Sequence, residues 1–286
     1  MADNAADRQD ANGGFFARFW GVRGSIPCPG PDFIRYGGNT SCLEVQCSGR
    51  MFIFDGGTGL RPLGVHLENK GDPVDADLFF SHTHLDHING LPFFKSAFKA
   101  KNRFRFWAGH LRPRFKLRDV ICQLMAEPLF PVPIDIMEAD IAFRDFAAGE
   151  TFRPRPDITI RTAPLNHPNG ATGYRIEHLG KSIAYVTDTE HKPGEIDKTI
   201  VDLVRDVDVF IYDSTYTDAE YPSYTGWGHS TWQEGARLAD AAGAKTFVIF
   251  HHDPSHNDDV MDRIAGEAET HRPGTLVARE GMVIRP

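Results

Sequence analysis

The sequence predicts an α/β protein in which two mixed β-sheets pack together and helices cover their outer faces. Three observations lead to this prediction. The chain has 286 residues, of which 41% are apolar and 24% charged, so it is long enough to bury one large core. Segments typical of strands, broken by Gly, Pro and Asn, come first and are followed by a helical segment. The same order of strands and then a helix recurs in the second half of the chain.

The first half of the chain supplies β-rich segments separated by turn residues. Strands are predicted at 15–20, 42–47, 51–54, 78–80, 103–107 and 141–143. A helix is predicted to start near Ile88, directly after a short run rich in histidine. These elements would form the first sheet and part of its cover.

The second half of the chain repeats this arrangement with clearer local signals. Strands are predicted at 158–162, 173–176, 182–186, 209–212 and 246–250. Leu179-Gly180 lies between two of these strands and predicts a hairpin. A helix is predicted over 231–242, because Thr231 and Glu234 have the spacing of a capping box and Gly243 follows the last helical residue.

Residues 1–14 are expected to form a disordered tail, and residues 15–286 a single domain, because no linker divides them. The tail is polar and lacks the apolar stretch of a secretory signal. No apolar run approaches the roughly 18 residues that a membrane helix needs. The four cysteines form no Cys-x-x-Cys pair and are typical of reduced thiols. We therefore expect a cytoplasmic protein with no membrane partner.

The net charge of −8 argues against broad binding of nucleic acid. One segment differs, because residues 95–118 contain nine basic and no acidic residues, with aromatic side chains between them. This segment could attract a phosphate-bearing substrate or single-stranded nucleic acid. Alternatively, it is a solvated surface whose aromatic side chains pack inward.

The residues that carry chemistry begin with Ser81-His-Thr-His-Leu-Asp-His87, directly after an apolar strand. His82 and His84 are two residues apart, so an extended backbone places both on one side. Asp86 and His87 lie where the chain turns into a helix, and there they can face a neighbouring point. Imidazole and carboxylate ligands suit zinc, manganese or iron, so the segment predicts a metal site.

Further candidate ligands stand at the ends of later strands, where scaffolds place functional groups. His167, Asp188 and His251 each follow an apolar strand. His252 competes with His251 for the last position. We favour His251 because it immediately ends the strand, and we expect His252 to contact substrate or to support a ligand.

The series His82-x-His84-x-Asp86-His87, then His167, Asp188 and His251, resembles the metal ligands of the metallo-β-lactamase superfamily. The resemblance extends over nearly the whole chain from about Phe15. It implies a dinuclear site with two divalent ions, Zn²⁺ or Mn²⁺, with Fe as a further option. The implied ligands of the first ion are His82, His84 and His167, those of the second are Asp86, His87 and His251, and Asp188 bridges the two.

The same resemblance implies that a hydroxide between the two ions is the nucleophile. We assign Asp86 a catalytic role in addition to its role as ligand. Asp55, in Phe54-Asp-Gly-Gly-Thr-Gly59, resembles the family's first-motif aspartate. It is expected to accept a hydrogen bond from a ligand imidazole and so fix its tautomer. The alternative is a simple turn residue before glycines.

Two segments resemble a narrower branch of the family, ribonuclease Z and related phosphodiesterases. They are the strand around Asp213 and the later Gly228-His-Ser-Thr231. The resemblance implies that His229 meets the scissile phosphate and donates a proton to the leaving alkoxide, while Asp213 keeps the imidazole charged. The alternative is that His229 only caps the helix that starts near Thr231.

The spacing of the ligands favours a small substrate. Ribonuclease Z carries a long arm for transfer RNA between the ligands that correspond to His167 and Asp188, whereas only 20 residues separate them here. This spacing is similar to that of phosphoribosyl cyclic phosphodiesterases and cyclic-nucleotide phosphodiesterases. We therefore predict hydrolysis of a small, cyclic phosphodiester, with nucleic acid not expected as a partner and a homodimer as an option. The alternatives are a hydrolase of carboxylic esters, lactones or thioesters, or a nuclease acting on single strands.

Overall fold

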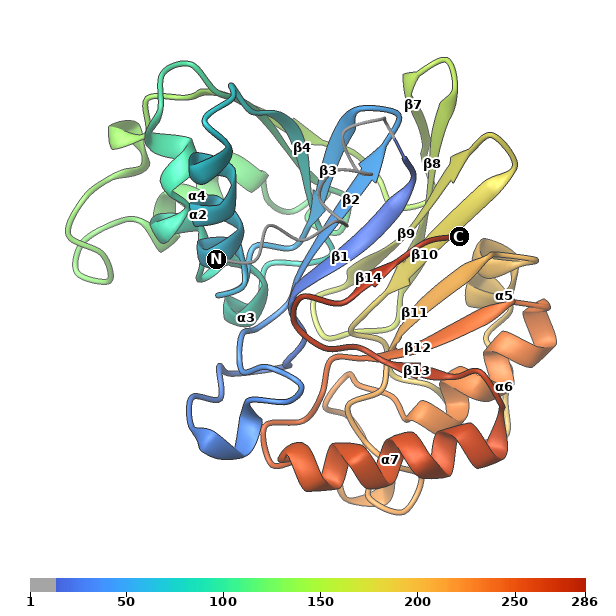
Figure 1. Cartoon of the computed structure of the whole chain (residues 1–286). Coiled ribbons are helices and arrows are strands. Elements are labelled where there is room, and N and C mark those ends of the chain that lie inside the picture. Colours follow the sequence, from blue (N-terminus) through green and yellow to red (C-terminus); the bar gives the residue numbers. More distant parts are fainter. Residues whose placement is uncertain (1–13) are drawn as a thin grey trace.

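The computed structural model describes residues 14–286. The expected tail of residues 1–14 therefore lies, apart from Gly14, outside the described residues. Within them, fourteen strands form two seven-stranded sheets that lie against each other (Figure 1).

The first sheet is built from strands of the first half of the chain, closed at one edge by a strand from the end. Its order is β14-β1-β2-β3-β4-β5-β6. The pairs from β14 to β3 are antiparallel, and those from β3 to β6 are parallel. Its strands are β1 (Phe16–Gly21), β2 (Cys42–Cys47), β3 (Arg50–Phe54), β4 (Asp75–Phe80), β5 (Arg103–Ala108), β6 (Asp140–Asp145) and β14 (Val283–Ile284).

The second sheet follows the same principle with the order β13-β12-β11-β10-β9-β8-β7. Strands β7 to β10 are antiparallel neighbours, and β10 to β13 are parallel. Its strands are β7 (Thr151–Arg155), β8 (Ile158–Leu165), β9 (Ala171–His178), β10 (Lys181–Val186), β11 (Val209–Asp213), β12 (Thr246–Phe250) and β13 (Leu276–Val277).

Helices cover the outer face of each sheet. Figure 1 shows α2 and α4 on one side of the molecule and α5, α6 and α7 on the other. Each set packs on its own sheet through a separate apolar cluster. The predicted class, two mixed sheets flanked by helices, is confirmed. The helices are α2 (Leu60–Lys70), α3 (Leu85–Ile88), α4 (Leu117–Leu124), α5 (Lys198–Val204), α6 (Trp232–Ala242) and α7 (Asp258–His271).

A third apolar cluster fills the space between the two sheets, and aromatic rings dominate it. Phe79 on β4 stacks on Phe54 of β3 and on Trp107 of β5, each with ring centroids 5.5 Å apart. From the second sheet, Tyr174 packs against Phe54 and donates a hydrogen bond to the carbonyl of Phe80 at 2.6 Å. These contacts fix one sheet relative to the other at the end where β4 delivers the histidine-rich segment.

Two local predictions for the second half, the hairpin and the helix cap, agree with the structure. Strands β9 and β10 form a hairpin around Leu179-Gly180, with Lys181 opposite His178. The Thr231 side chain accepts a hydrogen bond from the Glu234 amide at 3.0 Å, and Gly243 ends the helix in the left-handed conformation. Thr231 is itself the N-cap, so His229 is not needed for that role.

The prediction of a helix starting near Ile88 is wrong. Helix α3 begins at Leu85 and ends at Ile88, because the chain then passes through Gly90 and Pro92, which enter a short 3₁₀ turn. Helices α2, α4, α5 and α7 were not predicted from the sequence. In α2, Pro62 lies in the first turn, where proline is tolerated, whereas Gly64 disfavours the helix interior and packing against the sheet overrides that preference.

In the basic segment of residues 95–118, the aromatic side chains of the strand point inward, whereas Phe115 is 59% exposed. Phe104 and Phe106 are completely buried beneath α2 and α4. Arg105 lies 2.7 Å from Asp77, and Arg103 lies 2.9 Å from Asp140, so both guanidinium groups have acidic partners. These contacts favour the interpretation as a solvated surface over a stacking surface for nucleic acid.

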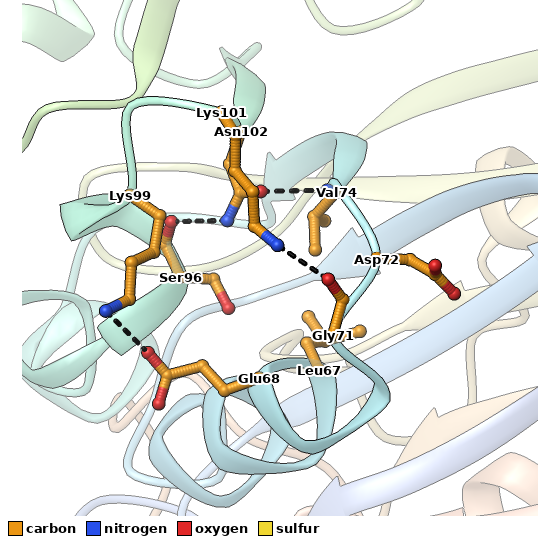
Figure 2. Close-up of a pocket in the computed structure, with 9 residues that line it drawn as sticks. All are labelled: Leu67, Glu68, Gly71, Asp72, Val74, Ser96, Lys99, Lys101 and Asn102. Carbon is orange, nitrogen blue, oxygen red and sulfur yellow. Dashed lines mark hydrogen bonds and ion pairs between the residues drawn. The ribbon is translucent and has the colours of Figure 1, made fainter.

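Two lysines of this segment line a pocket at the end of α2, drawn in Figure 2. Lys101 Nζ donates to the Gly71 carbonyl at 2.6 Å, and Lys99 lies 3.8 Å from Glu68. A cation at a helix C-terminus stabilises the exposed carbonyls there. Lys99 and Lys101 therefore interact with the C-terminal end of α2 and not with the histidine-rich segment.

Among residues 14–286, no helix has the length and apolar character needed to cross a membrane.

Candidate metal centre

The carboxyl ends of strands from both sheets meet at one edge of the sandwich, and every predicted ligand lies there. Chain crossings at the carboxyl ends of parallel strands commonly create such crevices. The contributing positions are Asp55 after β3, residues 82–87 after β4, His167 after β8, Asp188 after β10, Asp213 at the end of β11 and His251 after β12.

Three of these residues have an unusual backbone. Asp55, Asp188 and His251 adopt positive φ angles of 62°, 56° and 65°. This left-handed region is sparsely populated by residues with a side chain, and it persists only where the surroundings impose it. In all three cases the chain turns sharply after a strand.

The first group of donors consists of His82, His84 and His167. One ring nitrogen of each lies within 4.8 Å of the others. His167 Nε2 is 3.1 Å from His84 Nδ1. His82 Nε2 is buried and has no hydrogen-bond partner among the described residues. A buried nitrogen without a partner is costly, and a metal ion would satisfy it.

The second group consists of Asp86, His87, Asp188 and His251, again with donor atoms within 4.8 Å and all buried. His87 Nε2 lies 3.2 Å from Asp86 Oδ2 and 3.3 Å from His251 Nε2. Nitrogen and oxygen donors without a thiolate suit zinc, manganese or iron. The residues present therefore fit a divalent metal centre, as the family resemblance implies.

Asp188 lies between the two groups. Its Oδ1 is 3.6 Å from His82 Nε2 and 3.9 Å from His167 Nε2. Its Oδ2 is 3.2 Å from His87 Nε2 and 3.3 Å from His251 Nε2. One carboxylate oxygen thus faces each group, which is the arrangement that a bridging ligand requires.

The acids and imidazoles shift each other's protonation. Burial, together with the charge of His87, holds the pKa of His82 well below its ordinary value, so His82 is neutral and able to ligate. Burial also opposes the charged form of His87, but Asp188, Asp86 and Asp55 outweigh it and raise the pKa of His87 well above its ordinary value. The three carboxylates therefore stabilise a positive charge at this point, and a divalent cation would supply it.

Asp55 belongs to neither donor group but fixes Ser81 and the candidate ligand His87 through hydrogen bonds. Its carboxylate accepts hydrogen bonds from the Ser81 amide at 2.7 Å, the Ser81 hydroxyl at 2.8 Å and the Tyr185 hydroxyl at 2.8 Å. Its Oδ2 also lies 2.8 Å from His87 Nδ1. This contact leaves His87 Nε2 facing the ligand group. Asp55 is thus far more than a turn residue.

Other residues fix the rings of His167 and His251, and the sequence analysis did not identify them. His167 Nδ1 lies 2.7 Å from the Gly228 carbonyl, which requires that nitrogen to carry the proton and leaves Nε2 for a metal. His251 Nδ1 lies 3.0 Å from the Thr215 hydroxyl, which donates to Asp213 at 2.6 Å. Both residues belong to the segments that resemble the phosphodiesterase branch, but their contacts with His167 and His251 could not be predicted, because these partners are distant in sequence.

The loop after β1 completes the second group. The Ser25 amide donates to Asp86 Oδ2 at 2.7 Å. A Cβ atom on Gly24 would lie 2.3 Å from His251 Cε1, so only glycine fits at this position.

His229 and Asp213 form a pair beside both groups. His229 Nδ1 lies 3.1 Å from Asp213 Oδ2 and 3.7 Å from Asp188 Oδ1. Its ring stacks on His251 with centroids 5.0 Å apart. Burial disfavours the charged imidazole, but Asp213, followed by Asp188, outweighs burial and raises the pKa of His229 to about 9.

The structure separates His251 from its neighbour and argues against one of the two roles expected for His252. His251 lies in the second donor group. The His252 side chain is completely buried, and its Nε2 lies 2.8 Å from the Ala278 carbonyl. A contact of this ring with substrate is therefore ruled out, because the chain turns at His251 and directs the next side chain into the protein.

Comparisons with known proteins agree with this architecture. A ribonuclease Z of Gemmatimonas aurantiaca is 27% identical over 298 residues, covering 85% of this chain and 89% of that protein. A ribonuclease Z of Haloarcula marismortui is 22% identical and covers 92% of this chain and 94% of that protein. The metallo-β-lactamase fold protein YhfI from Bacillus subtilis superimposes with a TM-score of 0.70 at 17% identity, covering 94% of this chain and 98% of that chain.

A family model described as a β-lactamase superfamily domain matches residues 50–252, well over half of the chain. This range contains every candidate ligand from His82 to His251. The prediction of a metal-dependent hydrolase with the metallo-β-lactamase fold is confirmed. By its family match, its fold and the arrangement of its donor groups, the chain belongs to the β-lactamase superfamily.

Proposed function

We propose that this protein is a phosphodiesterase that hydrolyses a small, cyclic phosphodiester. The observation that carries the proposal is the pair of His229 and Asp213 beside the two donor groups. Cleavage of a phosphodiester expels an alkoxide, which needs a proton donor. A thioester hydrolase with the same donor groups has less need of one, because a thiolate leaves without a proton, whereas carboxylic esters and lactones also expel an alkoxide and are distinguished by the substrate screen below.

Two divalent ions fit the proposal, with Zn²⁺ or Mn²⁺ favoured and Fe as a further option. His82, His84 and His167 would hold one ion, Asp86, His87 and His251 the other, and Asp188 would lie between them. When bound, such ions lower the pKa of water and neutralise phosphate charge.

The chain's own residues supply the proton and its position. Nδ1 of His229 is engaged by Asp213, and no described residue hydrogen-bonds its Nε2. The side chain is 12% exposed, so Nε2 is left to donate to a leaving oxygen. Asp213 is itself held by the Thr215 hydroxyl and by the Thr189 amide, so its carboxylate cannot rotate away from His229.

The size of the substrate rests on the short hairpin between the ligand His167 and the ligand Asp188. Strands β9 and β10 are joined by Leu179 and Gly180 alone, which leaves no room for an arm. Our expectation that nucleic acid is not a substrate gains no support from the relatives, because the two compared above are named ribonuclease Z. RNA therefore belongs among the substrates to be tested. The predicted homodimer and cytoplasmic location stay predictions.

The test is a substrate screen on protein reconstituted with Zn²⁺ or Mn²⁺. We expect turnover of cyclic phosphodiesters and of bis(p-nitrophenyl) phosphate, and a loss of roughly 100-fold or more in His229→Ala. His271→Ala, which removes an exposed histidine on α7, is the matched control. Turnover of aryl esters or lactones with no phosphodiester cleaved would overturn the proposal. Cleavage of linear RNA in preference to cyclic phosphodiesters would overturn the part that concerns size.

A further inference from the structure

Trp227 is a large aromatic side chain that the fold holds in solvent beside the candidate site. It is 63% exposed, and it lies two residues before His229. Exposing a tryptophan leaves most of its apolar surface in water, so burial against the protein does not explain its position.

The backbone on both sides of Trp227 is fixed by one carboxylate. Glu190 accepts hydrogen bonds from the Gly226 amide at 2.9 Å and from the Gly228 amide at 2.7 Å. The Trp227 amide donates to the Tyr224 carbonyl at 3.1 Å. Both glycines have positive φ angles, 92° and 87°. The tryptophan is therefore presented on an ordered turn.

A series of aromatic contacts connects Trp227 with the proton donor. The Trp227 ring stands edge-on to Tyr224, with centroids 5.5 Å apart. Tyr224 stacks on Tyr216 at 4.3 Å, with the two planes 6° apart. Tyr216 contacts the ring of His229 at 6.1 Å. The series runs from the candidate site outward to solvent.

Two more exposed apolar side chains adjoin the site in sequence. Leu85, which is 66% exposed, lies between His84 and Asp86. Ile26, which is 58% exposed, follows Ser25, whose amide binds Asp86. The loops that carry donor groups thus present apolar side chains outward, and these suit a flat apolar group better than a charged one.

We propose that Trp227, held by Glu190 and backed by Tyr224, is a stacking surface for the base of a nucleoside phosphodiester. The inference rests on the proposed function, because it assumes that a phosphodiester lies beside His229. Among small phosphodiesters, a flat aromatic group adjacent to the phosphate is supplied by a nucleobase, and bases stack on aromatic side chains. A base-free sugar cyclic phosphate has nothing to place on this surface.

The test compares substrates with and without a base. Metal-reconstituted wild type, Trp227→Ala and Trp227→Phe are assayed with 2′,3′-cyclic AMP, with a base-free ribose cyclic phosphate and with a short oligoribonucleotide. Leu179→Ala is the matched control, because Leu179 is 81% exposed at the opposite end of β10 from Asp188. We expect KM for 2′,3′-cyclic AMP to rise about 5- to 100-fold in Trp227→Ala. KM for the base-free substrate should stay unchanged, and Trp227→Phe should retain most of the affinity.

The oligoribonucleotide arm distinguishes a free nucleotide from a base within a strand, since either source fits the same surface. Binding of AMP and of ribose 5-phosphate is measured on the same variants, so the inference is tested even if the wild type cleaves no phosphodiester and the proposed function fails. Equal losses for base-bearing and base-free ligands, or no loss for either, would overturn the inference. A change of oligomeric state in Trp227→Ala, with unchanged affinity for AMP, would overturn it also and assign Trp227 to a subunit contact.

Discussion

Asp188 offers one carboxylate oxygen to each donor group, with Oδ1 near His82 and Oδ2 near His87 and His251. This division depends on the backbone, because the positive φ of Asp188 turns its side chain back between the groups. Single residues therefore decide whether the site can hold two ions. The same holds for the proposed proton donor His229, whose pKa is raised chiefly by Asp213.

The pair of His229 and Asp213 predicts a specific pH dependence. The protonated imidazole is the active acid, and its pKa is raised to about 9. We expect kcat to fall as the pH rises through about 9, where His229 loses its proton. In Asp213→Asn, the fall should move to lower pH, towards the ordinary histidine value of about 6.5. The measurement is kcat from pH 6 to 10 for both proteins, and an unchanged alkaline limb in Asp213→Asn would contradict the assigned role.

We expect a substitution of Asp55 to lower metal affinity, although Asp55 is not itself a candidate ligand. Asp55→Asn replaces one of the carboxylate oxygens that face His87, Ser81 and Tyr185 with a donor group. We expect metal affinity to fall about 10- to 100-fold. Titration of the metal-free protein with Zn²⁺ measures it. Asp208→Asn, a change to a buried acid that binds Ser182 and Lys245 at the other end of the sheet, serves as the control and should leave affinity intact.

At the scale of elements, the turn of residues 226–228 positions both the candidate ligand His167 and the proposed proton donor His229. Its Gly228 carbonyl fixes the ring of His167, and its chain continues directly into His229. Glu190, which holds the turn, follows Asp188 by two residues. Its amide donates a hydrogen bond to the Asn166 carbonyl, and its carbonyl accepts one from the Asn166 side-chain amide. The loops after β8, β10 and β11 are thus fastened to one another at Glu190.

Glu190→Gln is predicted to loosen this turn. The amide group retains only one acceptor oxygen for the two glycine amides that the carboxylate now serves. We expect kcat to fall roughly 10- to 100-fold, because His229 and His167 lose their fixed positions. Steady-state kinetics with a base-free substrate isolates this effect from stacking on Trp227. Glu195→Gln, at an exposed position of the same loop, should behave as wild type.

Helix α6 allows a prediction about stability. Thr231→Ala removes the side chain that caps the helix through the Glu234 amide. The free energy of unfolding should fall by about 1 kcal/mol. Denaturant unfolding measures this, and Thr231→Ser, which keeps the hydroxyl, should recover most of the loss. Equal losses in both variants would assign the effect to packing of the threonine methyl group.

At the scale of the whole molecule, the site stands where two sheets meet, and neither sheet supplies all the donors. The first sheet delivers residues 82–87, and the second delivers His167, Asp188 and His251. The aromatic core between the sheets, centred on Phe79, holds them in this relation. A ligand that binds both sets of donors should therefore stabilise the complete fold.

Metal removal should lower the thermal stability of the protein. A ligand that binds only the folded state adds about 2.7 kcal/mol when its free concentration is about 100 times Kd. We expect the Tm of chelator-treated protein to rise on addition of Zn²⁺ or Mn²⁺, and this rise to become smaller in His82→Ala, which removes a donor of the first group and leaves the second group intact. Differential scanning calorimetry measures the shift, with His271→Ala as the control that keeps it. An identical Tm with and without metal would contradict a site that spans both sheets.

The sequence by itself identified the side chains that the structure brings together in the two donor groups, because residues 82–87 and the polar residues that end later strands are local signals. The hairpin at Leu179 and the cap at Thr231 could also be predicted from the sequence, since turns and caps depend on neighbouring residues. Helix α2 could not be, because Gly64 weakens its local signal and tertiary packing restores the helix.

Only the tertiary structure decided how these side chains face one another. It placed His251 in the centre and buried His252, joined Asp55 to Tyr185 across the two sheets, and set Glu190 beneath Trp227. It also turned Phe104 and Phe106 of the basic segment inward. The physical reason is that each of these outcomes depends on contacts between residues far apart in the chain, and such contacts exist only after the two sheets have packed.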